Sequence, residues 1–228
     1  MPERTRAILL DALGTLLHFE PPAPLLRAEL RRRLAVDVGA AAAAVAIRDE
    51  IAFYRAHLHE GRDAPSLARL RRRSAEAMRP ALGLDADGAV LTEALLAALR
   101  FRAYPDAAPA LERLRALGLR TVVVSNWDAS LHERLQETGL APLVDAAVAS
   151  AELGSAKPGG AIFARALELA GVPAEAALHA GDSPREDVEG ALAAGLRAVL
   201  VARNGPAPPV PAGVPVIATL GELPGTVG

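Results

Sequence analysis

The stretch AILLDALGTLLHF, residues 7–19, decides how this chain is predicted to fold. Four apolar residues, 7–10, run directly into the carboxylate of Asp11, and Gly14 and Thr15 follow shortly after it. A short apolar run that ends in turn residues is typical of a strand buried in a parallel sheet. We therefore expect a buried strand that delivers Asp11 to one edge of the sheet, where Gly14 turns the chain away.

Further short apolar runs alternate with helical segments along the rest of the chain. The runs lie at residues 120–126, 144–150, 176–182 and 197–203, with a last edge strand expected at 214–220. Helical periodicity covers residues 106–118, 129–139, 159–171 and 187–195. Each of these segments ends in a glycine, as is common at helix C-termini: Gly118, Gly139, Gly171 and Gly195. Strand and helix in alternation predict a doubly wound α/β sheet.

Residues 20 to about 102 interrupt this alternation, because they show helical patterns alone. About four helices are expected there, separated by Gly61, Pro65, Pro80 and Gly83. The proline-rich start of the insert, at residues 21–24, and its end near Tyr104 resemble two hinge strands. We therefore divide the chain into a core, residues 1–18 and 103–228, and an inserted helical domain, residues 19–102.

Composition excludes several classes of protein. With 228 residues, 51% of them hydrophobic, the chain can bury a full core, while a net charge of −2 argues against nucleic-acid binding. There is no cysteine, so disulfides and thiolate metal sites are excluded. No apolar run is long enough to span a membrane and no signal-peptide pattern is present, so a cytoplasmic location is expected. The sequence carries no P-loop, GxGxxG or HExxH motif.

Polar side chains follow four of the predicted strands. In an open α/β sheet, ligands bind at the carboxyl ends of the strands, so these side chains are expected to converge there. They are Asp11 after the first strand, Ser125, Asn126, Trp127 and Asp128 after the second, Lys157 in a loop after the third, and Asp182, Ser183, Glu186 and Asp187 after the fourth.

Carboxylates gathered at one edge repel each other unless a cation neutralises them. Oxygen ligands without histidine or cysteine favour Mg²⁺. A lysine and a hydroxyl beside such an ion form a site for a phosphate-sized anion, and an aspartate held there can attack phosphorus. His179 falls inside a predicted buried strand and is expected to be a core residue.

Four segments resemble, in order and spacing, the four motifs of the haloacid dehalogenase (HAD) superfamily. They are DALGTL at 11–16, VVVSN at 122–126, Lys157-Pro158, and GDSPREDVEGA at 181–191. The resemblance covers nearly the whole chain and extends to the helical insert, which is similar to that superfamily's C1-type cap. Within the superfamily, the sequence looks most like the group of L-2-haloacid dehalogenases and HDHD3/REG-2-like proteins. It implies a Rossmann-like three-layer core with a parallel sheet and an inserted α-helical cap.

The resemblance also implies a role for each residue of the motifs. Asp11 would be the nucleophile, and Ser125 with Asn126 would hold the transferring group. Lys157 would pair with the nucleophile and with the substrate anion. Asp11, the carbonyl of Leu13, Asp182 and Asp187 would form the Mg²⁺ site. Trp127 would either line the substrate entrance or pack against the cap.

Leu13 departs from the superfamily pattern. Most of its phosphatases have a second Asp at this place, which protonates the leaving oxygen, a contribution typically worth about 10²- to 10⁴-fold. Leucine cannot transfer a proton, so three interpretations stay open: substrates with good leaving groups, an acid supplied from elsewhere, or a reaction other than phosphate hydrolysis. The superfamily's dehalogenases carry an aromatic residue here, and Leu13 is apolar but not aromatic.

The acidic fourth motif, with Asp182 and Asp187, favours metal-dependent chemistry over halide release. We therefore expect a Mg²⁺-dependent hydrolase that acts on a small phosphorylated metabolite through an aspartyl-phosphate. The alternatives are a metal-independent 2-haloacid dehalogenase and a catalytically weak binding protein with this fold. The expected partner is a small anionic molecule, and neither nucleic acid nor a membrane is expected.

Overall fold

The structure, a computed structural model, describes residues 4–203 and 205–227. The chain forms two compact units. The first contains the N-terminal segment up to His18 and the chain from Ala103 onward, and the second is Phe19–Arg102. None of the helices within the described ranges combines the length and apolarity needed to cross a membrane.

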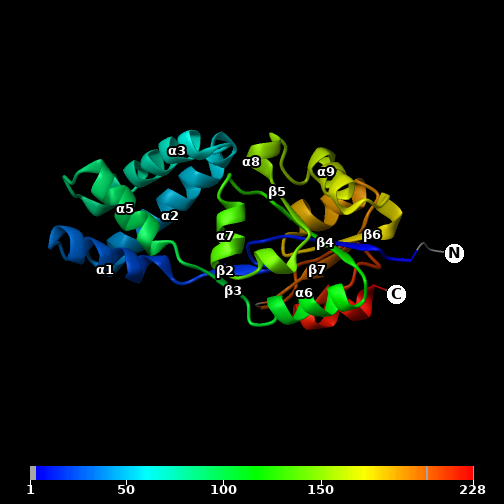
Figure 1. Ribbon diagram of the computed structural model, residues 1–228. Coiled ribbons are helices and arrows are strands. Elements are labelled where there is room, and N and C mark those ends of the chain that lie inside the picture. The colour runs from blue at the N-terminus through cyan, green and yellow to red at the C-terminus, as the bar shows by residue number, and fades with distance from the viewer. Residues whose placement is uncertain (1–3, 204, 228) are drawn as a thin grey trace. The chain divides into compact units, whose positions relative to one another are not determined.

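A six-stranded sheet in the order β5-β4-β1-β6-β7-β8 forms the centre of the first unit (Figure 1). The strands are β1 (Ala7–Leu10), β4 (Arg120–Ser125), β5 (Ala146–Ala149), β6 (Ala177–Gly181), β7 (Arg197–Val201) and β8 (Val216–Ile217). Every neighbouring pair is parallel, so the predicted α/β sheet is confirmed. In register, Leu10 of β1 lies between Val123 of β4 and Ala180 of β6, which brings the ends of these three strands together.

Helices cover both faces of this sheet (Figure 1). On one face α6 packs with the C-terminal 3₁₀ helix η5, and on the other α9 packs against β4, β5 and α10. The bounds are α6 (Ala107–Ala116), α7 (Leu131–Glu137), η2 (Ala141–Leu143), α8 (Ser150–Leu153), α9 (Gly160–Ala170), η3 (Ala174–Ala176), the π-helical turn η4 (Pro184–Glu189), α10 (Gly190–Ala193) and η5 (Leu220–Thr226).

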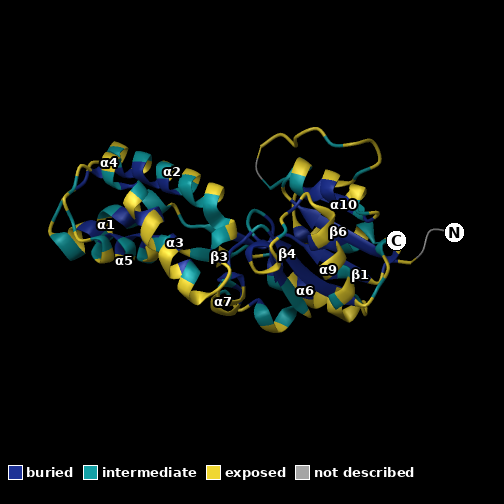
Figure 2. Ribbon diagram, turned by 90° about the horizontal axis from the view of Figure 1, so that it is seen from above, coloured by how far each residue is buried: buried dark blue, intermediate teal, exposed yellow. Residues whose placement is uncertain are grey.

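The central strands are buried, as their continuous apolar runs predict, whereas the edge strands β5 and β8 are only partly buried. β1 is buried along its whole length, and the sheet appears as a dark band between helices whose outer sides are exposed (Figure 2). Side chains of β4, α9 and β7 form the core on one side, among them Val122, Val124, Ile162, Phe163 and Leu200. The four glycines predicted to end helices all have positive φ: Gly118, Gly139, Gly171 and Gly195.

The second unit is helical. It contains α1 (Pro22–Leu34), α2 (Ala40–His57), η1 (Leu58–Glu60), α3 (Ala64–Ala77), α4 (Arg79–Leu82) and α5 (Gly88–Ala98). Its core is formed by apolar residues of these helices, including Leu26, Leu30, Met78, Leu91 and Leu95. The sequence indicates a separation of helices at Pro80, and within 66–82 the helical pattern does form two helices, since α3 ends at Ala77 and α4 begins at Arg79. Pro80 explains the break, since its ring lacks an N–H and clashes with the preceding turn.

Both connections between the units contribute to a second sheet, which pairs β2 (Leu17–Phe19) with β3 (Phe101–Ala103). The prolines expected in the first hinge strand lie elsewhere. Pro21 precedes α1 and Pro22 is its first residue. A proline is well suited to that position, because the first N–H groups of a helix have no intrahelical acceptor.

Candidate active site

Asp11 lies directly at the carboxyl end of β1. Its backbone N–H donates to the Ala180 carbonyl at 3.0 Å, which fixes the residue against β6, and it is 6% exposed. The chain then turns sharply, with the N–H of Gly14 bonded to the Leu17 carbonyl at 2.8 Å and a backbone bridge between Leu13 and Leu17. The Asp11 carboxylate is therefore held at the edge of the sheet.

Lys157 reaches Asp11 from the loop between α8 and α9. Its Nζ lies 2.6 Å from Asp11 Oδ1 and 2.5 Å from Asp187 Oδ1. The backbone of the loop is fixed by Asn126, whose Oδ1 accepts from the Lys157 N–H at 2.8 Å while its Nδ2 donates to the Lys157 carbonyl at 3.0 Å. One buried ammonium thus bridges two buried carboxylates.

Residues at the end of β4 connect these groups further. Ser125 Oγ donates to Asp11 Oδ1 at 3.0 Å, and Asn126 Nδ2 donates to Glu186 Oε2 at 2.9 Å. Asn126 therefore contacts both the lysine loop and η4. Side chains at or after the ends of four strands, β1, β4, β5 and β6, thus form one hydrogen-bonded network.

Asp187 accepts hydrogen bonds on both carboxylate oxygens. Oδ1 is shared by Lys157 Nζ and by His179 Nε2 at 2.8 Å, and Oδ2 accepts from the Ser183 N–H at 2.9 Å. Gly181 leaves room for this carboxylate, because a Cβ there would lie 2.1 Å from Asp187 Cγ.

Asp182 completes a cluster of three acids with Asp11 and Asp187, whose ligand oxygens all lie within 4.8 Å of one another. The Asp182 carboxylate sits over Gly14, where a Cβ would approach its Oδ2 to 2.1 Å. It is the exposed member of the cluster, whereas the other two are buried.

The electrostatics follow from burial and from the single cation. Burial raises the pKa of Asp11 by more than the Lys157 ammonium lowers it. Burial also opposes the charged forms of Lys157 and Asp187. The two carboxylates nevertheless hold the pKa of Lys157 above its usual range, and Lys157 with His179 holds the pKa of Asp187 well below its own.

Partial desolvation, together with the charges of Asp11 and Asp187, raises the pKa of Asp182 to about 7. Burial and neighbouring like charges both disfavour the ionised form of a carboxyl group. Three acids that share one lysine therefore favour binding of a further cation, and an oxygen-only donor set of this kind suits Mg²⁺.

The structure brings together six of the residues predicted for the site: Asp11, Ser125, Asn126, Lys157, Asp182 and Asp187. Leu13 lies in the turn that follows Asp11, half-buried. Trp127 is 6% exposed, and its indole N–H donates to Ser130 Oγ at 3.3 Å. Its two predicted places, at the substrate entrance or packed against the cap, stay predictions.

Two members of the network have no role in the sequence prediction. His179 is treated there as a core residue, and Glu186 is placed at this edge without a function. His179 is indeed fully buried, but its ring nitrogen contacts Asp187. A histidine in an otherwise apolar, buried strand is the sequence signal by which its role in the network could have been recognised.

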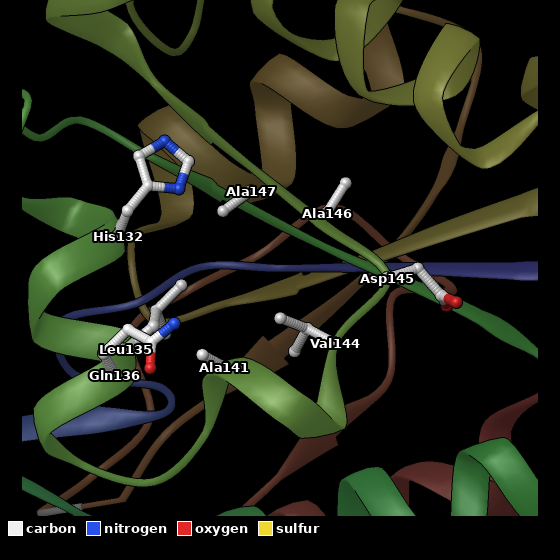
Figure 3. A pocket seen from close by; sticks show the side chains of 8 residues that line it. All are labelled: His132, Leu135, Gln136, Ala141, Val144, Asp145, Ala146 and Ala147. Atoms are coloured by element: carbon white, nitrogen blue, oxygen red, sulfur yellow. The ribbon is translucent and has the colours of Figure 1, made fainter.

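A pocket elsewhere in the first unit lies between α7, η2 and the edge strand β5 (Figure 3). It is lined by His132, Leu135, Gln136, Ala141, Val144, Asp145, Ala146 and Ala147, none of them a predicted site residue. Asp145 has structural partners, since its carboxylate accepts from the Thr121 N–H at 2.7 Å and pairs with Arg120 at 3.0 Å.

Comparison with protein families finds one matching model, which describes a haloacid dehalogenase-like hydrolase and covers residues 5–195. Among curated proteins, the haloacid dehalogenase-like hydrolase domain-containing protein 3 of Xenopus laevis is 39% identical over 42% of this chain and 40% of its own length. A phosphoserine phosphatase of Thermus thermophilus is 39% identical over 46% of this chain and 43% of its own length. The chain thus matches about two fifths of the length of these relatives.

Several solved structures match over almost their full length, among them a phosphatase and a dehalogenase. A HAD phosphatase from Thermococcus onnurineus is 26% identical, with a TM-score of 0.66 and 98% of both chains covered. A 2-haloacid dehalogenase from Pseudomonas syringae is 29% identical, with a TM-score of 0.66 and 97% of both chains covered. Both kinds of chemistry therefore occur among proteins that are similar to this one.

Proposed function

Because this chain belongs to the haloacid dehalogenase-like hydrolase family, we propose that it is a Mg²⁺-dependent phosphatase of small phosphorylated metabolites, with Asp11 as nucleophile. The observation that carries the proposal is the acidic cluster of Asp11, Asp182 and Asp187 around the Lys157 ammonium. An anionic substrate would be repelled by these carboxylates unless a cation neutralised them.

The donor set supports Mg²⁺ as that cation. Asp11 and Asp182 would hold the ion, with the Leu13 carbonyl as a further oxygen ligand, and Asp187 would contribute its charge. The bound ion would supply positive charge that offsets repulsion between Asp11 and the phosphoryl oxygens.

The reaction would take place in two displacements at phosphorus. A carboxylate oxygen of Asp11 forms a bond to phosphorus while the bond to the leaving oxygen breaks, and the leaving group departs with that electron pair. Lys157 and Ser125 hold Asp11 in place and donate hydrogen bonds to the transferring group. Water then attacks phosphorus in the aspartyl-phosphate while the bond between phosphorus and the Asp11 oxygen breaks. This releases inorganic phosphate, gives a proton of the attacking water to the solvent and regenerates the Asp11 carboxylate.

Leu13 restricts the substrates that this centre would turn over rapidly. No carboxylic acid follows Asp11 at this position, so an alkoxide leaving group would depart without the usual proton donor. Acyl and aryl phosphates need less help, because their leaving groups are stable as anions. We therefore propose a preference for activated phosphates, and we propose that the helical unit, Phe19–Arg102, acts as the cap that selects the substrate.

A second candidate is metal-independent dehalogenation of 2-haloacids. The apolar Leu13 favours it, because halide leaves without protonation, and the similar dehalogenase from Pseudomonas syringae gives it support. In this reaction, Asp11 would attack carbon and form an ester. A third candidate, a weak or non-catalytic binding protein, would also fit the absence of a proton donor at Leu13.

The experiment measures phosphate release from acetyl phosphate, p-nitrophenyl phosphate and glycerol phosphate, with Mg²⁺ or with EDTA, beside halide release from 2-chloropropionate. We expect phosphate release that EDTA abolishes, fastest with the two activated substrates. Asp11→Asn should remove turnover, and Asp37→Asn, an exposed acid in the second unit, should not.

Chloride release that persists in EDTA would instead establish the dehalogenase. Inactivity in every arm would favour the binding protein. Full activity in Asp11→Asn would exclude Asp11 as the nucleophile.

A further inference from the structure

His179 is an unusual residue for its place in the fold. It lies within β6, it is completely buried, and its ring makes a T-shaped contact with Phe163 from α9 at a centroid distance of 5.2 Å. Its neighbours along the strand, Leu178 and Ala180, are apolar. An imidazole at such a position costs free energy unless its polar atoms have partners.

One of the two ring nitrogens has a partner. Nε2 lies 2.8 Å from Asp187 Oδ1, whereas the buried Nδ1 has no hydrogen-bond partner among the described residues. A carboxylate oxygen accepts, so the hydrogen must be on Nε2. Packing alone would favour an apolar side chain, which leaves no nitrogen unsatisfied.

The contact with Asp187 connects His179 to the rest of the cluster. Together with Lys157 Nζ on Oδ1 and the Ser183 N–H on Oδ2, it fixes both oxygens of the carboxylate. Asp187 in turn holds the Lys157 ammonium at 2.5 Å, and the same ammonium reaches Asp11 at 2.6 Å. A chain of hydrogen bonds therefore runs from His179 to the candidate nucleophile.

We propose that His179 is a positioning residue of this centre: through its Nε2–H it fixes the rotamer of Asp187, and thereby places the Lys157 ammonium on Asp11. The proposal rests on the function proposed above. His179 touches neither substrate nor nucleophile, and its effect is on the rate of the chemical step rather than on substrate binding.

Two variants separate this role from simple packing. His179→Gln keeps an N–H donor near the position of Nε2, and His179→Leu keeps the bulk but removes the donor. We expect His179→Leu to lower kcat toward acetyl phosphate on the order of 10- to 100-fold, with KM within about twofold, as for the outer partners of metal-site ligands. His179→Gln should recover most of kcat.

A packing role predicts the opposite order, with leucine tolerated and the polar glutamine harmful. That order would overturn the proposal. So would a kcat of His179→Leu equal to that of the wild type, and so would an equal loss of kcat in His179→Leu and His179→Gln when both variants fold. Circular dichroism and the melting temperature establish folding.

A second measurement does not depend on turnover. A two-bond ¹H–¹⁵N spectrum of the wild-type protein without added metal reports the tautomer of each of the five histidines, and the signal missing in His179→Gln identifies His179. We expect the Nε2–H tautomer, and the Nδ1–H tautomer would overturn the proposal. If the wild type hydrolyses no phosphate substrate, the proposed function fails, while the tautomer still decides whether His179 holds Asp187.

Discussion

At the scale of single residues, Gly14 shows how a missing side chain makes room for a functional one. Its φ of +86° lies in the left-handed region, and a Cβ would lie 2.1 Å from Asp182 Oδ2. Two requirements thus coincide at one position: the turn after Asp11 and the approach of the Asp182 carboxylate.

Gly14→Ala is expected to displace the Asp182 carboxylate from the cluster. Since that side chain can rotate away, the protein should fold, with a loss of about 1–2 kcal/mol from left-handed strain. Its kcat toward acetyl phosphate should fall by at least about 10-fold. Gly83→Ala is the matched control, because φ is +62° there and nothing lies within 4 Å of the added Cβ. Equal kcat in the two variants would contradict the expected role of Gly14.

At the scale of elements, the second unit contains a buried acid that its helices do not neutralise. Glu50 on α2 is 3% exposed, and Ser74 on α3 is 2% exposed. Burial raises the pKa of Glu50 to about 7, and the Ser74 hydroxyl offsets only part of this effect. The folded unit therefore binds a proton that the unfolded chain has already lost.

This difference predicts the direction of a pH dependence. Between the ordinary value of 4.5 and about 7 the folded state holds the proton and the unfolded state does not, so stability falls as pH rises through this window. Above it the cost is constant, about 3 kcal/mol. Glu50→Gln should raise the melting temperature by several degrees at pH 8 and leave it unchanged at pH 4.5.

Asp49→Asn serves as the control for the Glu50 variant. It removes a charge from the neighbouring, 40% exposed side chain, and should change stability by less than about 0.5 kcal/mol at either pH. An equal gain from Glu50→Gln at both pH values would show that burial does not raise the pKa of Glu50.

The elements also show how far local pattern predicts structure. The strand from Ala7 to Leu10 and its neighbours are recognisable because parallel strands buried on both faces are continuously apolar. The break at Pro80 is predictable locally too, because a proline within a helical pattern interrupts the helix. The proline-rich hinge is misplaced because Pro22 suits a helix start as well as a strand.

At the scale of the whole first unit, Arg203 connects segments that are far apart in the chain. Its Nη2 donates to the Thr15 carbonyl at 2.7 Å and its Nη1 to Asp106 Oδ2 at 3.0 Å, while the guanidinium lies 3.8 Å from the centre of the Tyr104 ring. Asp106 Oδ2 also accepts from the Leu220 N–H at 2.8 Å. Both connections to the helical unit are thus anchored on the core by one side chain.

Arg203→Met should lower the free energy of unfolding by about 2 kcal/mol, because it leaves the Thr15 carbonyl and the Asp106 carboxylate without their charged donor. Urea unfolding measures this loss. The control is Arg165→Met, which removes an exposed pair with Glu168 that should contribute less than about 1 kcal/mol. Similar losses in both variants would show that Arg203 stabilises no more than a surface pair.

The sequence by itself determined the sheet, the inserted helices and the ends of the strands where polar groups gather. These features depend on the spacing of apolar residues and on the positions of turn residues, both of which are set by residues close together in the sequence. The resemblance already implied that Lys157 pairs with Asp11. Only the tertiary structure decided that the same ammonium also contacts Asp187, and that His179 contacts Asp187 from inside β6. Contacts between residues that lie far apart in the sequence, such as Asp187 and Lys157, arise from how strands and loops pack. The local spacing of residues does not determine which carboxylates then share the Lys157 ammonium.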